Sequence, residues 1–392
     1  MNLGTHKGPH GDEFCAFALL MRYNPNYRSA KIFTYGSKEE ALASAKRDKV
    51  TLIGIGEGAL DEHGKEGQEC AASLAARQLR LEDDLKFFRL LEEVRSCDLA
   101  AKARRTHIPE LLKILYEHHP EADVIAWGLR AYSTLVEACE TGNLNPQVTD
   151  VLEEISVELA GKYAGTNQSE SMRRSWMDCQ AAVSNSRGSL TELRTVADLI
   201  SLTSRDEAVK WARMGIEALF HRQLDFERAV EEVKKGYRFV VPWSQMERGM
   251  VIRGQYHGVA IYSDNSQSIR AFRSNRVGNF DLLIVRNKDG HVQVFSNAKS
   301  RIPMVSCVKA LRHAEALKRG IRLNINELGQ EGDCPAVPQW FYFAKGGMVM
   351  NGSKSHPGIE ITKLSDRELV KVVQDAFQQV QSNSSFRNPV LK

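Results

Sequence analysis

Histidine and acidic side chains gather at two points near the start of this chain of 392 residues. In the first, the segment Thr5–Glu13, the residues His6, His10 and Asp12 stand at positions i, i+4 and i+6. Glycine and proline residues interrupt the segment, which predicts a loop rather than a strand or a helix. Neutral imidazole nitrogens and carboxylate oxygens are the usual ligands of manganese, iron and zinc. The segment is therefore a candidate metal site, or else a plain strand-to-helix turn in which Asp12 caps the helix.

A second cluster, Asp61–His63, follows the apolar, glycine-rich run Val50–Gly56. This run predicts a buried strand that ends in a polar loop. In open α/β sheets, ligands bind beyond the carboxyl ends of the strands. Two strand ends that each carry histidine and aspartate therefore indicate one shared metal site.

The residues around these clusters predict the elements that would position them. Residues 1–82 alternate between short apolar runs and amphipathic segments, which indicates βαβ units and a mainly parallel sheet. A helix is expected after Asp12, because Phe14, Phe17, Ala18 and Met21 fall on one stripe. The other predicted elements are strands at Lys31–Tyr35 and Thr51–Gly56 and helices at Lys38–Arg47 and Gln68–Leu81.

Residues 83–235 carry helical periodicity almost throughout. We expect a helical region that packs on the sheet or is inserted after it, and no repeat of fixed period organises it. The predicted helices are Asp84–Cys97, Ile108–His119, Ala122–Cys139, Asn145–Tyr163, Ser169–Ser184, Leu190–Leu202 and Asp206–Leu219.

From residue 236 the pattern changes to runs rich in β-branched and aromatic residues, which predicts a smaller α+β domain over 236–392. Asn287–Gly290 suits a hairpin turn, and Ser365 with Glu368 forms a capping box before the last helix. The polar tail after Gln381 is expected to be disordered. The predicted strands are Tyr237–Val241, Met250–Arg253, Val259–Tyr262, Leu282–Arg286, Val292–Phe295 and Trp340–Ala344, and the predicted helices are Ser306–Arg319 and 365–380.

The two polar clusters resemble those of a known family. Thr5–Gly8 is followed by His10, Asp12 and Glu13, and then by Asp61–His63. This order is similar to that of the DHH phosphoesterase superfamily and, within it, of the Myg (melanocyte-proliferating-gene) family of metal-dependent 3'–5' exonucleases. The resemblance covers about the first hundred residues best and the last hundred loosely.

The chain departs from that family at three positions. Its first loop is one residue shorter, which gives it the spacing of the related inorganic pyrophosphatases. Glu62 replaces the middle histidine of Asp-His-His. Gly54, or Glu57 if the loop is shifted, stands where the family carries the aspartate that bridges two metals. The number of bound metals, one or two, is therefore left open.

Alternating elements and helical periodicity predict the α/β fold class with a helical region at 83–235, which matches nothing in the family. The resemblance implies a DHH-like metal-binding domain at 1–82 and a substrate-binding domain at 236–392. It also implies divalent cations, most readily Mn²⁺, that activate a water to attack phosphorus. Asp61 would act in catalysis, and His63 would be a ligand or a general acid. Asp98 matches a further family aspartate, or else caps a helix. The implied ligands are His6, His10, Asp12, Asp61, His63 and Asp98.

Two other segments carry groups suited to an anionic substrate. Arg104 and Arg105 can face a phosphate, or else form a solvated basic run. The glycine-rich segment Gly346–His356 allows backbone N–H groups to approach an anion, although such sequences also make plain turns. It resembles the segment with which the superfamily holds its substrate. The expected contacts there are Gly346, Gly347, Asn351, Ser353, Lys354 and His356.

The composition is that of an ordinary soluble globular protein, with 42% hydrophobic and 26% charged residues. The formal net charge of +4 permits a nucleic-acid partner without arguing for one. Seven scattered cysteines without a CxxC pair indicate reduced thiols and a cytoplasmic location. No apolar run reaches the roughly 18 residues of a membrane helix, and we expect no signal peptide.

We therefore expect a cytoplasmic, metal-dependent phosphodiesterase, in particular a 3'–5' exonuclease. Its partner would be the end of a short single-stranded nucleic acid or a nucleotide, with no membrane partner and with a homodimer left open. One alternative is a small-substrate phosphatase or pyrophosphatase, which the spacing of the first loop favours. The other is a degenerate, non-catalytic relative that binds nucleic acid or protein, which Gly54 and Glu62 favour.

Overall fold

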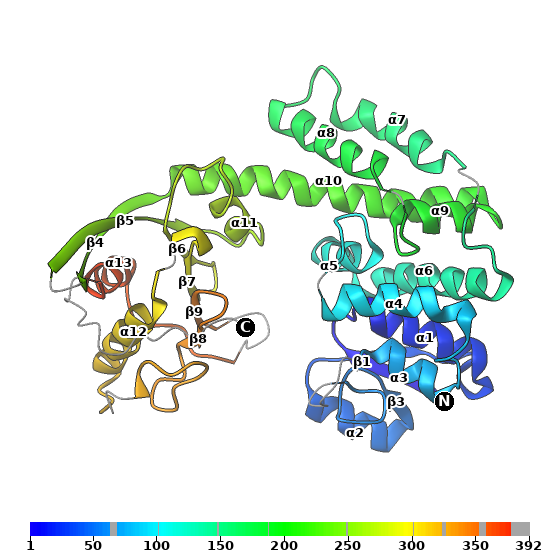
Figure 1. The fold of residues 1–392 in the computed structure, drawn as a ribbon, viewed down its shortest axis with the longest axis horizontal. Coiled ribbons are helices and arrows are strands. Elements are labelled where there is room, and N and C mark those ends of the chain that lie inside the picture. Colours follow the sequence, from blue (N-terminus) through cyan, green and yellow to red (C-terminus); the bar gives the residue numbers. More distant parts are fainter. Residues whose placement is uncertain are drawn as a thin grey trace. The chain divides into compact units, whose positions relative to one another are not determined.

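The computed structural model describes residues 1–62, 69–100, 102–146, 149–186, 188–247, 250–300, 302–323, 327–352 and 358–377, with the side chains of 245–247 excepted. The chain divides into two compact units, Met1–Leu224 and Asp225–Lys392 (Figure 1). The predicted boundary between residues 82 and 83 falls inside the first unit. The predicted tail after Gln381, together with Ser353, Lys354 and His356, lies outside the described residues.

The first unit contains a parallel sheet with the strand order β2-β1-β3. Its strands are β1 (Asn2–His6), β2 (Ile32–Tyr35) and β3 (Val50–Leu52), and β1 pairs in parallel with both neighbours. A parallel sheet was expected here, but β3 ends earlier than predicted. Gly54 and Gly56 have φ values of 64° and 93°, which an extended strand does not adopt. The carboxyl ends of all three strands meet at one edge of this sheet.

Helix α1 (Gly11–Tyr23) is the centre of the first unit's core. The predicted apolar stripe covers only one face of this helix, whereas in the structure every residue from Gly11 to Leu20 is buried. The helices that pack against α1 include α3 (Ala71–Gln78), α4 (Leu85–Leu99) and α6 (Glu121–Thr141). A helix that is buried on all sides is usually apolar all round. Helix α1 departs from this at Asp12 and Glu13, two acidic residues that are buried in the interior of the protein.

The remaining predicted helices of this unit are present, with ends shifted by a few residues. Trp127 of α6 stacks on Trp211 with ring centroids 4.5 Å apart, and each indole N–H donates to the other residue's carbonyl. The helix expected to end at Leu219 continues to Lys235, into the second unit. The further helices are α2 (Lys38–Asp48), η1 (Pro25–Tyr27), α5 (Ile108–His118), α7 (Val151–Tyr163), α8 (Glu170–Ser184), α9 (Leu193–Ser201) and α10 (Arg205–Lys235).

The second unit contains a mixed sheet with the order β4-β5-β6-β7-β9-β8. Only the β5–β6 pairing is parallel among these strands. Two predicted short strands merge into β5, because Gly254 and Gly258 continue the strand. The rings of Trp243 and Phe239 on β4 lie over these glycines and leave no room for a side chain. The strands are β4 (Tyr237–Glu247), β5 (Met250–Tyr262), β6 (Leu282–Arg286), β7 (Val292–Ser296), β8 (Phe341–Phe343) and β9 (Met348–Asn351).

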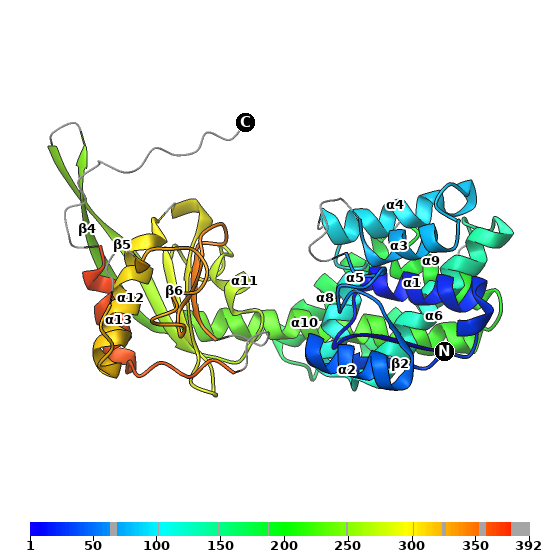
Figure 2. The same cartoon turned by 90° about the horizontal axis from the view of Figure 1, so that it is seen from below.

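Alternation along β6 places helices on both faces of this sheet (Figure 2). Leu282 and Ile284 share a core with α12 (Met304–Arg319) and α13 (Asp366–Asp375), whereas Leu283 packs with α11 (Ser268–Phe272) and the end of α10. A short helix η2 (Ala298–Ser300) follows β7. The predicted capping box at Ser365 is confirmed, and Gly290 closes the predicted hairpin turn. None of the described helices is long and apolar enough to cross a membrane.

Candidate metal centre

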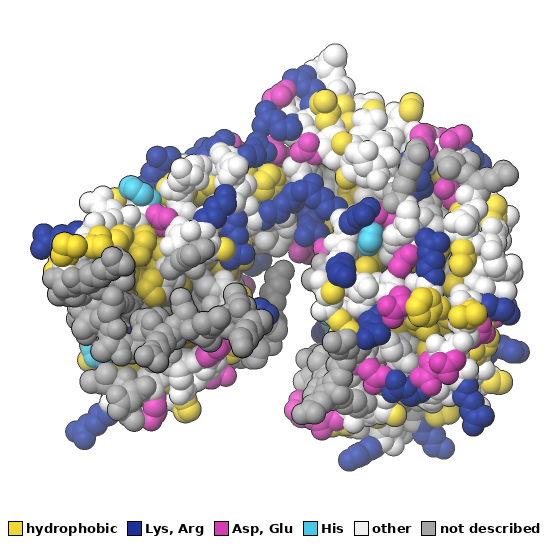
Figure 3. All heavy atoms as spheres, in the orientation of Figure 1, with side chains coloured by type: hydrophobic (Ala, Val, Ile, Leu, Met, Phe, Trp, Pro, Cys, Tyr) yellow, Lys and Arg dark blue, Asp and Glu magenta, His cyan; other side chains and the backbone are white. Residues whose placement is uncertain are grey.

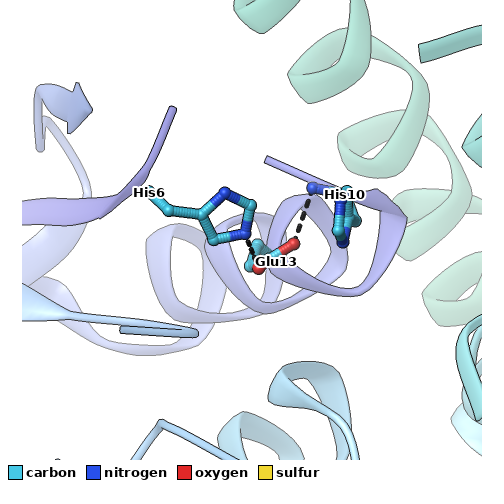
Figure 4. A group of neighbouring side chains, drawn as sticks. All are labelled: His6, His10 and Glu13. Carbon is cyan, nitrogen blue, oxygen red and sulfur yellow. Dashed lines mark hydrogen bonds and ion pairs between the residues drawn. The ribbon is translucent and has the colours of Figure 1, made fainter. Parts of the chain in front are cut away.

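The first predicted loop connects the carboxyl end of β1 to the first turn of α1. Gly8, with φ of 67°, lets the chain reverse between His6 and His10. His6 Nε2 lies 2.8 Å from Glu13 Oε1, and the backbone N–H of His10 donates to Glu13 Oε2 at 2.6 Å. Figure 4 shows the Glu13 carboxylate between the two histidines. The loop thus brings two imidazoles and a carboxylate together at the edge of the sheet.

Within the described residues, three overlapping groups can hold a metal ion, and the ligand atoms of each group lie within 4.8 Å of one another. Each of His10, Asp12 and Glu13 belongs to two groups. Asp98, near the end of α4, joins from a neighbouring helix. The groups are His6–His10–Glu13, His10–Asp12–Asp98 and Asp12–Glu13–Glu62. The structure therefore brings together four of the predicted ligands, His6, His10, Asp12 and Asp98.

The inner side of this cluster is buried and its outer side faces solvent. Asp12 and Glu13 are only 3% and 1% exposed, whereas His10 and Asp98 are exposed. Asp12 Oδ2 accepts the backbone N–H of Ala71 at 3.0 Å, which fixes the carboxylate. A site with buried ligands on one side and an open side suits a metal that meets a substrate.

Negative charge accumulates around Asp12. Burial raises the pKa of Asp12 well above its ordinary value, and the charges of Glu13, Asp98 and Glu62 raise it further. Burial acts to lower the pKa of His6, but the hydrogen bond and charge of Glu13, the Lys7 carbonyl and the charge of Glu62 together outweigh this and raise the pKa to about 9. Burial lowers the pKa of His10. Because carboxylates that crowd one another are costly to ionise, a bound cation would favour their charged forms.

The carboxylate of Glu13 lies where a side chain at Gly54 would otherwise be. A Cβ built on Gly54 would lie 2.5 Å from Glu13 Oε1 and 3.2 Å from its carboxyl carbon. Gly54 was singled out because the resembled family has a bridging aspartate there. In this chain the Glu13 carboxylate lies against the same backbone position, so a carboxylate is present although it comes from α1. Sequence reasoning missed Glu13 as a candidate ligand, because an acidic residue in the first turn of a helix is common.

The second predicted cluster is rearranged. Asp61 is buried and its Oδ2 accepts the N–H of Glu57 at 2.5 Å, which closes a tight turn in which Glu57 has φ of 57°. Asp61 is in none of the three ligand groups. The predicted role of Asp61 as a ligand stays a prediction, and its neighbour Glu62 lies in the ligand group with Asp12 and Glu13. His63 lies outside the described residues.

The predicted substrate residues have different positions. Arg104 and Arg105 are exposed on the loop before α5. Gly346 and Gly347 form the turn between β8 and β9, where Gly347 N–H donates to Ala344 O at 3.1 Å. This amide is used by the turn itself, so it does not offer the anion cradle that we expected.

Asn351 is a structural residue, and its prediction as a substrate contact is wrong. Its side chain is fully buried. The amide nitrogen donates to the carbonyls of Gln339 at 2.9 Å and Glu360 at 3.1 Å, and the amide oxygen accepts the N–H of Thr362 at 3.0 Å. With these bonds made, the side chain ties two loops together and presents nothing to a ligand.

Comparisons with known proteins give little guidance. No family model matches the chain, and no curated protein matches it. A solved structure of an uncharacterized protein from Helicobacter pylori G27 aligns over 96% of this chain and 99% of that chain, at 9% identity. The TM-score of 0.20 is too low for this likeness to carry a conclusion.

Proposed function

We propose that this chain is a metal-dependent phosphoesterase that binds one or two Mn²⁺ ions at the cluster around Asp12. The observation that carries the proposal is the overlap of the three ligand groups at His10, Asp12 and Glu13. Sites that hold two ions close together share ligands between them, and such sites are typical of phosphatases and nucleases.

The donor set fits a divalent cation. Carboxylate oxygens with imidazole nitrogens suit manganese, and the crowding around Asp12 is relieved by positive charge. When bound, the metal supplies a nucleophilic water at neutral pH and neutralises charge on a phosphate.

The chain's own residues divide into two roles. Asp12, fixed by the N–H of Ala71, and Glu13, fixed by His6 and the N–H of His10, hold their carboxylates in place from the buried side. His10 and Asp98 lie on the exposed side, where a substrate phosphate would arrive. Substrate binding should therefore change the surroundings of His10 and Asp98 more than those of the buried Asp12.

The preferred substrate is the end of a short single-stranded nucleic acid, cleaved in the 3'–5' direction. The resemblance of the first loop supports this choice. On the face drawn in Figure 3, Lys and Arg side chains are interspersed with acidic ones. All seven cysteines are free thiols, which agrees with the proposed cytoplasmic location.

A pyrophosphatase or small-substrate phosphatase is the second candidate, and the i, i+4, i+6 spacing of His6, His10 and Asp12 favours it. Both candidates use the same ligands, so the substrate must decide between them. A labelled single-stranded oligonucleotide and inorganic pyrophosphate, each with Mn²⁺, separate the two. Stepwise release of mononucleotides supports the exonuclease, and release of phosphate from pyrophosphate alone supports the second candidate.

The metal site itself is tested by the matched pair Glu62→Gln and Asp61→Asn, with Mn²⁺ affinity measured by titration calorimetry. Glu62→Gln should weaken Mn²⁺ binding by about tenfold or more, because it removes a carboxylate from the cluster. Asp61→Asn should change Mn²⁺ affinity little, because that carboxylate serves the turn at Glu57. The reverse ranking would restore the family's ligand set, and a wild type that binds no Mn²⁺ would end the proposal.

A further inference from the structure

A cleft of the first unit contains a set of reactive groups other than the metal cluster. It has a volume of about 660 Å³, and its walls come from α4, from the loop before α5 and from residues 188–189. Cys97 of α4 and His107 at the start of α5 line it. Neither residue belongs to any of the ligand groups around Asp12.

Cys97, His107 and Glu192 form a chain of contacts. Cys97 Sγ lies 3.6 Å from His107 Nδ1, and His107 Nε2 lies 3.0 Å from Glu192 Oε1. Thr106 Oγ1 donates to the other oxygen of Glu192 at 2.5 Å. Glu192 is fully buried and His107 is 7% exposed. An imidazole held by a buried carboxylate and placed beside a thiol is the arrangement found at activated cysteines.

The backbone holds this arrangement rigidly. Ile108 N–H donates to Thr191 O at 2.8 Å, and Leu193 N–H donates to Thr106 O at 2.9 Å. These bonds fasten the segment of His107 to the segment of Glu192 on both sides. The backbone positions from which the imidazole and the carboxylate extend are therefore fixed relative to each other.

Cys97 is the accessible thiol of the chain. The other six cysteines, at positions 15, 70, 139, 179, 307 and 334, are buried. Cys97 is partly exposed and lines the cleft. A reagent in solution that attacks thiols therefore meets Cys97 before any other cysteine of the folded protein.

The charges of the cleft favour an anionic partner. Arg89, Lys102 and Arg104 line it, against the carboxylates of Glu92 and Glu93. Glu93 already accepts hydrogen bonds from Ser189 Oγ at 2.6 Å and Leu190 N–H at 2.7 Å, and it contacts Arg89 at 3.3 Å. Glu92 contacts Arg95. Lys102 and Arg104 are exposed and add positive charge at the mouth.

The same contacts argue against acyl transfer. A tetrahedral oxyanion is stabilised by fixed hydrogen-bond donors near the nucleophile, commonly backbone N–H groups. The N–H groups of Leu190 and Thr191, which follow the lining residue Ser189, are bonded to Glu93 at 2.7 and 3.3 Å. Attack on sulfur needs no such donors, so a disulfide is the better electrophile.

We propose that Cys97 is a modification site that exchanges with small anionic disulfides of the oxidised-glutathione type. Sγ attacks one sulfur of the disulfide, a new S–S bond forms and the old one breaks. The proton shared by Sγ and Nδ1 leaves with the departing thiolate, which becomes a thiol. One thiol and one disulfide yield one thiol and one disulfide, so the step consumes no other oxidant. The exchange step itself uses no metal, and Cys97 directly precedes Asp98 of the metal cluster in the sequence.

The test treats the full-length chain with oxidised glutathione or with neutral hydroxyethyl disulfide, and follows adducts by intact mass and peptide mapping. We expect one glutathionyl group per chain, on Cys97, formed about tenfold faster than the neutral adduct because of the basic mouth. The double variant Lys102→Gln and Arg104→Gln should lose this preference and keep its rate with the neutral reagent. Both side chains are exposed, so this variant should fold normally.

A second variant examines the role of His107. His107→Gln should slow both reagents by about tenfold or more, because the thiol loses the imidazole beside it. If circular dichroism finds this variant unfolded, the comparison of the two reagents on the double variant decides alone. Modification of another cysteine first, or equal rates for both reagents in wild type and double variant, would overturn the proposal.

Discussion

Two turns of this protein carry similar residue types and have opposite roles. His6–Glu13 in the first unit and Gly346–Gly352 in the second each combine glycine with polar side chains. In the first, buried carboxylates crowd together, and burial followed by their mutual repulsion raises the pKa of Asp12. In the second, the buried Asn351 amide makes three hydrogen bonds to backbone groups. Polar residues beside glycine are thus candidate ligands where several charged groups lie close together. They have a structural role where every polar group is hydrogen-bonded within the protein.

The substitution Asp12→Asn should have the largest effect on the charged cluster. The substitution removes the central charge of the cluster, so Mn²⁺ affinity should fall by about 100-fold or more. The metal-free protein should instead become more stable at neutral pH, because the substitution removes a buried carboxylate whose charged form is disfavoured. Calorimetric titration and urea unfolding measure the two effects. The exposed Asp83→Asn is the control, and unchanged Mn²⁺ affinity in Asp12→Asn would refute the site.

Asn351→Ala tests the other side of the comparison. It leaves the carbonyls of Gln339 and Glu360 and the N–H of Thr362 without their partner, so the free energy of unfolding should fall by about 2–4 kcal/mol. Mn²⁺ affinity should stay unchanged. Denaturant unfolding checks the first result, with the exposed Asn279→Ala as control. A stable Asn351→Ala protein with altered substrate affinity would restore the substrate role that we withdrew.

The fold was more predictable than the sites. Parallel pairing of β1 with its neighbours and most helices followed from periodicity, which is a local property of the sequence. The proximity of Glu13 to Gly54 depends on how α1 lies against the sheet, and no local pattern contains that information. Similarly, the hydrogen bonds of Asn351 come from Gln339 and from residues 360–362, which only the folded chain brings together.

Gly54→Ala tests whether Glu13 replaces the missing strand-end carboxylate. The new methyl group would push the Glu13 carboxylate away, so Mn²⁺ affinity should fall by about tenfold. Alanine at φ of 64° also costs about 1–2 kcal/mol of stability. Gly142→Ala is the matched control, because Gly142 has φ of 73° and open space around it. Both variants should lose similar stability, and only Gly54→Ala should lose Mn²⁺ affinity; equal affinities would separate Glu13 from the site.

We expect the smallest effect on stability from a change in the buried pair of His107 and Glu192. In this pair, as at Asn351, polar groups have their partners inside the protein. Burial acts to lower the pKa of His107, but the contacts with Cys97 and Glu192 outweigh it and raise the pKa to about 9. A raised histidine pKa stabilises the folded state fully below about pH 6.5 and loses that contribution as pH rises through about 9.

The difference in unfolding free energy between wild type and His107→Gln should therefore be largest near pH 6 and should shrink towards pH 10. Urea unfolding at several pH values measures it, with His119→Gln, at the opposite end of α5, as the control. A difference that grows with pH would mean that His107 is neutral in the folded protein, and the pair with Glu192 would then not be an example of internal charge balance.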